Sequence, residues 1–179
     1  MTQSLSGKTI AVLATDGFEQ SELTEPKRRL EAMGATVHVV APDAKQIRGW
    51  QGKDWGDTVA VDKPLSQARV EDYDALVLPG GVINPDKLRT ERAAVELVQA
   101  FDKAGKPVAA ICHGPWMLAE SGVAKGRRLT SWPSLRTDLG NAGGQWEDAE
   151  VVVDGHVITS RKPDDIPAFS DAVAKAVAG

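Results

Sequence analysis

The chain has 179 residues, of which 42% are apolar and 26% are charged, and its formal net charge is −4. These values are typical of a single ordinary globular domain. No apolar run approaches the length of a membrane span, the first residues lack the basic start and apolar core of a signal peptide, and no basic cluster suggests a nucleic-acid surface. One cysteine excludes an internal disulfide and leaves a classical zinc site without enough ligands. We therefore expect a cytoplasmic protein that needs no metal or organic cofactor.

The N-terminal part predicts a strand–helix–strand unit. Residues 8–14 form a continuous apolar run rich in β-branched residues, which is typical of a strand buried on both faces of a parallel sheet. A helical pattern follows and ends at Gly34, a natural C-cap. Pro26 lies inside this pattern, so we expect the helix either to kink there or to begin later, with Thr24 as its cap. Residues 35–42 form the second strand.

The segment 43–72 differs from the rest of the chain. It is rich in glycine, tryptophan and charge, and its short alternating pieces predict a small β-hairpin excursion. Trp50 and Trp55 lie in this excursion, and two interpretations are open. The loop at 43–58, which carries both tryptophans, caps the crevice, or it meets a second subunit.

The remainder of the chain alternates strands and helices. The expected elements are a strand at 73–81, a helix at 91–103, a strand at 106–111, a helix at 115–121, a short strand at 128–132, a helical stretch at 133–139, a hairpin at 150–160 and a C-terminal amphipathic helix. Alternation of buried strands with helices favours one α/β domain over residues 1–179, with a central, mostly parallel sheet between helices.

Three junctions between a strand and the next helix carry the reactive side chains. They are Thr15–Glu19, Pro79–Gly81 and Cys112–Gly114. Because the carboxyl ends of parallel strands meet at one edge of a sheet, we expect these loops to converge on one crevice. A thiol, an imidazole, a carboxylate and glycine-rich backbone then lie within reach of one another.

Cys112 has the setting of an activated nucleophile. A turn between strand and helix would expose its sulfur at a helix N-terminus, where the helix dipole and free N–H groups favour thiolate. The backbone N–H groups of Gly81 and His113 are candidates for stabilising an oxyanion, and the Glu19 carboxyl for hydrogen bonding to the sulfur. The alternative is that Cys112 is an inert buried residue, but the sequence Cys-His-Gly-Pro at such a turn favours function.

Several motifs resemble the PfpI family, the group similar to intracellular protease I within the superfamily that includes the Parkinson-associated deglycase. The resemblance extends over nearly the whole chain. The matching segments are DGFE (16–19), LVLPGG (76–81), AICHGPWML (110–118), GRRLTSWPSLRTDLGNAGGQW (126–146), EVVVDG (150–155) and VITSRKPDDIPAF (157–169).

This resemblance implies a flavodoxin-like three-layer sandwich related to class I glutamine amidotransferases. By matched position it implies that Cys112 is the nucleophile, His113 its adjacent histidine and Glu19 the glutamate in contact with the sulfur. In peptidase-like members an acidic residue after the diglycine, contributed by a neighbouring subunit, orients the histidine, and Asp86 occupies this position. Family members are homodimers or hexamers in which the second subunit completes the site.

Three functions are compatible with these features. The first is a stress-protective deglycase or glyoxalase-like hydrolase, in which Cys112 adds to small reactive carbonyls or their early protein adducts. The second is an intracellular cysteine peptidase with a Cys112–His113–Asp86 triad completed by oligomerisation. The third is a redox sensor without turnover, in which Glu19 stabilises oxidised Cys112. We expect the first, because a confined site beside a single acid suits a small aldehyde better than a polypeptide.

Overall fold

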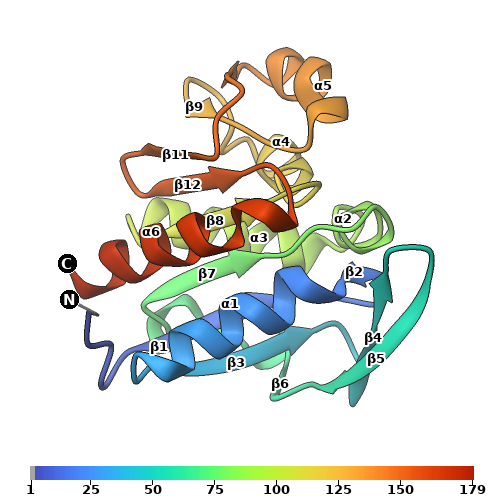
Figure 1. The fold of residues 1–179 in the computed structure, drawn as a ribbon, viewed down its shortest axis with the longest axis vertical. Coiled ribbons are helices and arrows are strands. Elements are labelled where there is room, and N and C mark those ends of the chain that lie inside the picture. The colour runs from blue at the N-terminus through green and yellow to red at the C-terminus, as the bar shows by residue number, and fades with distance from the viewer. Residues whose placement is uncertain (1–2) are drawn as a thin grey trace.

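A seven-stranded sheet organises the molecule in the computed structural model, which describes residues 3–179 (Figure 1). The strand order is β11-β12-β8-β7-β1-β3-β6, and every neighbouring pair is parallel except β11 and β12. The strands are β1 (Thr9–Leu13), β3 (Thr36–Ala41), β6 (Lys63–Pro64), β7 (Ala75–Leu78), β8 (Val108–Ile111), β11 (Val151–Asp154) and β12 (Val157–Ser160). The four residues of β7 and of β8 are all buried, as expected for the centre of a parallel sheet.

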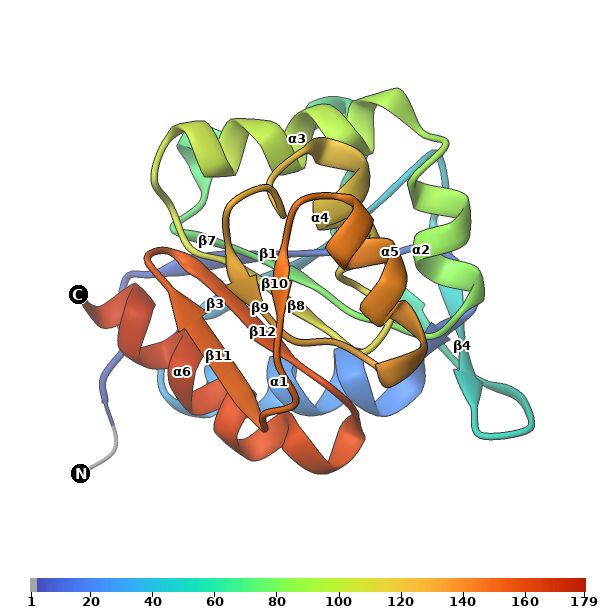
Figure 2. The ribbon, with the colours of Figure 1, turned by 90° about the horizontal axis from the view of Figure 1, so that it is seen from above.

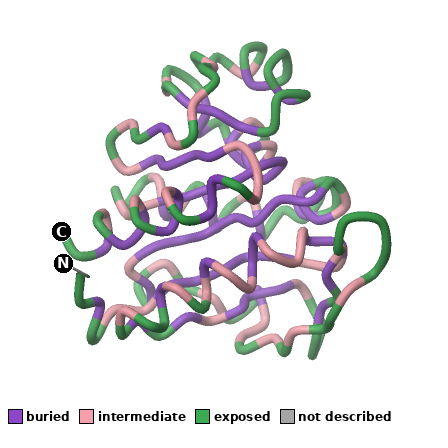
Figure 3. The backbone as a smooth tube through the Cα atoms, in the orientation of Figure 1, coloured by how far each residue is buried: buried purple, intermediate pink, exposed green. Residues whose placement is uncertain are grey.

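Helices cover both faces of the sheet, which gives three layers (Figure 2). Helices α1 and α6 pack on one face through residues such as Leu30 and Phe169, and α3 and α4 pack on the other through Phe101 and Leu118. The helices are α1 (Gln20–Ala32), α2 (Ile83–Leu88), α3 (Arg92–Lys103), α4 (Trp116–Ser121), α5 (Arg136–Asn141) and α6 (Ile166–Ala178). Figure 3 shows buried backbone concentrated in the central strands and in the inward faces of these helices.

Two small sheets flank the main one. The excursion expected at 43–72 contains the hairpin of β4 (Gln46–Gln51) and β5 (Asp54–Ala60), and β4 also pairs with β2 (Phe18–Glu19). Strands β9 (Arg128–Leu129) and β10 (Gln145–Trp146) form the second small sheet. Short 3₁₀ turns complete the chain at Leu65–Gln67, Val70–Asp72, Pro133–Leu135 and Pro163–Asp165.

Two local expectations require correction. Helix α1 begins at Gln20 rather than near Thr24, and Pro26 lies within it. The helix tolerates Pro26 because only one intrahelical donor is missing there, and the Leu23 and Leu30 side chains hold α1 on the sheet. Helix α2 was not expected, because its sequence INPDKL is short and contains a proline.

The flavodoxin-like sandwich with a mostly parallel sheet and added hairpins is thereby confirmed. Its parallel strands bring the three predicted junctions to one edge of the sheet. Within the described part of the chain, no helix is long and apolar enough to cross a membrane.

Candidate active site

Cys112 lies at a strained turn immediately after β8. Its backbone φ is +63°, and it is the only non-glycine residue in 3–179 with a positive φ. Such a conformation costs on the order of 1 kcal/mol or more and is concentrated at functional sites. The turn is held by a hydrogen bond from the Cys112 N–H to the Ser160 carbonyl (3.0 Å) and one from the Gly114 N–H to the Ile111 carbonyl (2.8 Å).

The sulfur is surrounded by hydrogen-bonding groups. The backbone N–H groups of Gly81 and His113 lie close to it and lower its pKa. The Nδ1 atom of His113 lies 3.3 Å from Sγ. The thiol is only 6% exposed, and the imidazole 8%. The structure thus brings Cys112, His113 and the Gly81 amide together, while oxyanion binding by the two amides stays a prediction.

The carboxyl group at the sulfur belongs to Glu22, not to Glu19 as the sequence suggested. Glu22 lies in the first turn of α1, has no exposed surface and lies beside the Cys112 thiol, close enough for its charge to raise the pKa of that thiol. Its Oε1 also accepts the N–H of Gly80 at 3.0 Å. Glu19 ends the first predicted junction and was therefore the expected partner of the sulfur. Helix α1 already starts at Gln20, however, so the acid that reaches the sulfur is Glu22, in the first turn of this helix.

Glu19 has a different place. It lines the same pocket, its backbone N–H donates to the Gly80 carbonyl (3.2 Å), and the backbone N–H of Gly52 lies near its carboxylate. Partial burial raises the pKa of Glu19. Glu19 is therefore a lining residue of the pocket rather than a partner of the thiol.

A signal for Glu22 was present in the sequence. Glu22 is in phase with Pro26 and Leu30 on the buried stripe of α1, where an acid has no solvent to face. Acids in such a stripe are rarely buried without a specific partner.

Burial controls the protonation of the site. It raises the pKa of Glu22 to about 8, with the charge of Glu19 as a second cause, and it lowers the pKa of His113. Burial, followed by the charge of Glu22, also raises the pKa of the Cys112 thiol, and the residue is buried rather than exposed as the sequence suggested, so burial opposes the expected thiolate. At neutral pH, Glu22 therefore carries a proton and His113 is an uncharged base.

Asn84 ties two of the junctions together, and sequence reasoning missed it. Its Oδ1 accepts the N–H of Thr15 (2.8 Å), and its Nδ2 donates to the carbonyls of Pro79 (3.0 Å) and Gly80 (3.3 Å). Asn84 is fully buried and lies in α2, a helix that no sequence pattern predicts. It fixes the glycine loop relative to the first junction.

Gly80 is required for close packing at the sulfur. A Cβ atom there would lie 2.6 Å from Glu22 Oε1, 2.7 Å from the Cys112 Cβ and 2.8 Å from the His113 nitrogen. We expect Gly80→Ala to lower the free energy of unfolding by about 2 kcal/mol or more, measured by urea denaturation. Gly140→Ala is the control, because a Cβ there meets no atom within 4 Å and alanine favours the helix. Equal stability of both variants would contradict this account.

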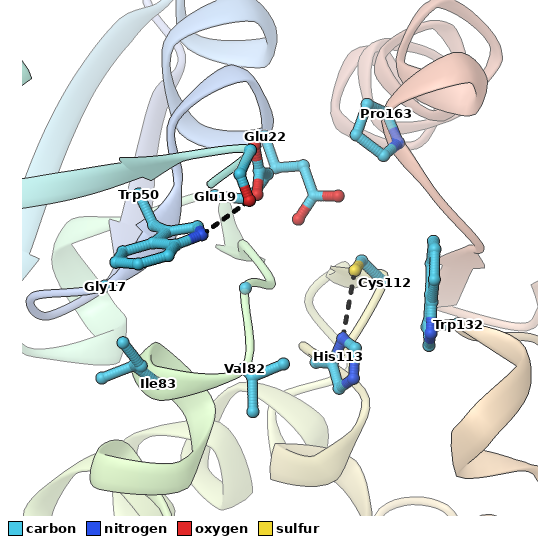
Figure 4. Close-up of a pocket in the computed structure, with 12 residues that line it drawn as sticks. Gly17, Glu19, Glu22, Trp50, Val82, Ile83, Cys112, His113, Trp132 and Pro163 are labelled. Carbon is cyan, nitrogen blue, oxygen red and sulfur yellow. Dashed lines mark hydrogen bonds between the residues drawn. The ribbon is translucent and has the colours of Figure 1, made fainter. Parts of the chain in front are cut away.

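The site opens into a pocket of about 510 Å³ (Figure 4). Trp50 and Trp132 stand on different sides of it, with Cys112 and His113 between them. Its lining residues are Gly17, Glu19, Glu22, Trp50, Gly52, Gly81, Val82, Ile83, Cys112, His113, Trp132 and Pro163. The set contains two acids and no lysine or arginine, which suits a small uncharged substrate. Trp50 thus lines the crevice, as one interpretation of the 43–72 excursion expected, whereas Trp55 does not.

Asp86 is not part of this pocket within one chain. It lies exposed on α2 and has no hydrogen bond to His113. Its expected contribution from a neighbouring subunit stays a prediction. Within residues 3–179 there is also no group of three His, Cys, Asp or Glu side chains placed to hold a metal ion.

Comparison with known proteins shows the family of this chain. A family model described as DJ-1/PfpI family matches residues 8–176. The chain belongs to the DJ-1/PfpI family. The putative cysteine protease YraA of Bacillus subtilis is 45% identical over 91% of this chain and 94% of its own length. Protein/nucleic acid deglycase 2 of Escherichia coli is 42% identical over 91% and 94%.

A solved structure of the same family shares the fold. The crystal structure of Drosophila melanogaster DJ-1beta is 31% identical, covers 98% of this chain and 92% of its own, and gives a TM-score of 0.87. The family membership suggested by the Cys-His-Gly-Pro motif is therefore confirmed. Names within the DJ-1/PfpI family include both deglycases and a putative cysteine protease, so the family supports a role of one of these kinds.

Proposed function

We propose that the protein is a cysteine-dependent hydrolase of small reactive carbonyls, such as methylglyoxal, and of their early adducts on proteins. One observation carries this proposal. Cys112 lines a pocket together with the Glu22 acid and the His113 base, whose Nδ1 lies 3.3 Å from Sγ, and burial raises the pKa of Glu22 to about 8 and lowers that of His113. Aldehyde chemistry at a thiol needs both a proton acceptor for the sulfur and a proton donor for the oxygen.

The first step joins sulfur to the aldehyde carbon. As Sγ of Cys112 attacks, His113 Nδ1 accepts the thiol proton, and the carbonyl electron pair moves to oxygen. The amides of Gly81 and His113 are the nearest backbone donors for that oxygen. Protonation by Glu22 then gives an uncharged hemithioacetal.

The second step needs no external oxidant. The Glu22 carboxylate, now without its proton, removes the proton from the former aldehyde carbon, and the resulting enediol is reprotonated at the adjacent carbon. This converts the hemithioacetal of methylglyoxal to a thioester of lactate. Water hydrolyses the thioester, releases lactate and restores the Cys112 thiol. The sum is methylglyoxal plus water to lactic acid.

The names of relatives support the deglycase reading. Proteins named deglycase in Pyrococcus abyssi, Thermococcus kodakarensis and Escherichia coli are 42–43% identical to this chain. The pocket of about 510 Å³, with two acids and no lysine or arginine in its lining, favours a small carbonyl over a polypeptide.

A peptidase is the second candidate, and the relative named putative cysteine protease favours it. Because Nδ1 of His113 faces the sulfur, Nε2 is the atom left for Asp86 of a second subunit. This reading requires a homodimer or hexamer with a shared site. The cytoplasmic location and the lack of a cofactor likewise stay predictions.

The deciding experiment compares the wild type with Cys112→Ala on two substrate classes. Conversion of methylglyoxal to lactate is measured alongside cleavage of casein and fluorogenic peptides. We expect carbonyl turnover that disappears in Cys112→Ala, while the peptides stay intact. Cleavage of peptides that depends on Cys112 would favour the peptidase. No turnover of either class would contradict both enzyme readings and favour the redox-sensor alternative, with Glu22 rather than Glu19 beside the oxidised sulfur.

A further inference from the structure

Two tryptophans contact the imidazole of His113, and we call them the tryptophan pair, Trp116 and Trp132. The Trp132 ring stacks on the imidazole with centroids 5.9 Å apart and an angle of 24° between planes. The Trp116 ring meets it edge to face at 5.2 Å and 66°. Hydrogen bonding to Cys112 uses only one edge of the imidazole, so these ring contacts determine its remaining orientation.

Each member of the tryptophan pair is held by partners outside the pocket. The Trp116 indole N–H donates to Asp138 Oδ2 at 2.9 Å, and the Arg89 guanidinium lies over the Trp116 ring at 5.4 Å. These contacts tie α4 to α5 and to the residue that follows α2. Trp116 is therefore a fixed surface for His113 rather than a freely rotating side chain.

Trp132 is fixed through its backbone to the nucleophile itself. Its N–H donates to the Cys112 carbonyl at 2.9 Å, and its own carbonyl accepts the Ser131 hydroxyl at 2.8 Å. Ser131 Oγ in turn accepts the indole N–H of Trp146 at 2.9 Å. These hydrogen bonds hold the backbone of Trp132 in a fixed position relative to the Cys112 turn.

Packing of the core does not explain Trp132. Its side chain is 39% exposed and belongs to neither hydrophobic core cluster. A tryptophan exposed to this extent adds little to folding stability, yet it stacks on the histidine that lies beside the Cys112 sulfur. We therefore infer that Trp132 has a role in the candidate active site.

We propose that the tryptophan pair positions the His113 imidazole toward Cys112, so that Trp132 and Trp116 are positioning residues of the reaction. This inference rests on the proposed function only where turnover of methylglyoxal is measured. The orientation of the imidazole does not depend on the identity of the substrate. By covering the ring, the pair also keeps water from it, which favours the uncharged base. Charged groups near His113 or the tryptophan pair are Glu19, Glu22, Arg89, Glu120 and Asp138.

The test uses Trp132→Leu, with Trp132→Phe as the conservative variant and Trp55→Leu as the control. Trp55 is 40% exposed, matches Trp132 in exposure and lies outside the pocket. The readouts are kcat and KM for methylglyoxal, the rate of Cys112 alkylation by iodoacetamide, and the pKa of His113 from NMR titration. The His113 resonance is assigned by its loss in His113→Gln.

For Trp132→Leu we expect kcat to fall about tenfold, slower alkylation, and a pKa of His113 that rises toward its ordinary value. Trp132→Phe should retain roughly half of the turnover because it keeps a stacking ring. Trp55→Leu should leave the titration of His113 unchanged.

The outcomes separate this inference from the proposed function. If the wild type turns over no carbonyl, the proposed function fails, but alkylation and titration still decide the role of the tryptophan pair. If Trp132→Leu alters turnover while the titration of His113 and the alkylation of Cys112 stay unchanged, the positioning role is overturned, because Trp132 then acts only as a wall of the pocket. Unchanged values in all three readouts would overturn it as well.

Discussion

We expect the replacement of Glu22 by glutamine to lower carbonyl turnover by about 100-fold, and Glu19→Gln to lower it only a few-fold. Glutamine keeps the shape of Glu22, and its carbonyl oxygen still accepts the N–H of Gly80, so the fold is retained. It cannot release and recover a proton, and the proton shift through the enediol depends on that exchange. Steady-state kinetics with methylglyoxal measure the effect.

The same pair of variants separates proton transfer from activation of the thiol. Above pH 8 the ionised Glu22 of the wild type repels a thiolate at Cys112, since Glu22 charge is among the causes that raise the pKa of the thiol. Cys112 should therefore react faster with iodoacetamide in Glu22→Gln than in the wild type at pH 9, although turnover is lower. Equal effects of Glu22→Gln and Glu19→Gln on turnover would return Glu19 to the central role.

We expect folding stability to fall as the pH rises from about 5 to 8.5, and Glu22→Gln to remove most of that fall. Burial raises the pKa of Glu22 from 4.5 to about 8, so the folded state binds more protons than the unfolded state between these values. Stability then declines with pH at up to about 1.4 kcal/mol per unit for this one group. Over the full window the loss approaches about 4 kcal/mol.

The difference between wild type and Glu22→Gln isolates this contribution. Burial lowers the pKa of His113, which acts in the opposite direction by reducing stability as the pH falls through the ordinary range of histidine. His113 is present in both proteins, so its contribution cancels in the difference. Urea denaturation at several pH values gives the curves. Parallel curves for the two proteins would show that Glu22 has no raised pKa in the folded state.

The sequence by itself was sufficient for the sheet and for the convergence of the Cys112, His113 and glycine-rich junctions at one edge of it. Continuous apolar runs such as 8–14 and 106–111 can only be buried between two helical layers, so they predict a parallel sheet directly. Parallel strands end at one edge, and this alone placed Cys112, His113 and the glycine loop together.

Only the tertiary structure decided which acid reaches the sulfur. Glu19 and Glu22 are three residues apart, and a shift of one helical turn exchanges their roles. The residue at which α1 begins determines which of the two acids faces the sulfur. Pro26 suggested a later start of this helix, so the sequence did not reveal it. Burial then sets the protonation states, because the desolvation of Glu22, His113 and Cys112 depends on every element packed around them. The tryptophan contacts to His113 arise in the same way, since Trp132 reaches the imidazole through chain packing across the sheet edge and not through any spacing in the sequence.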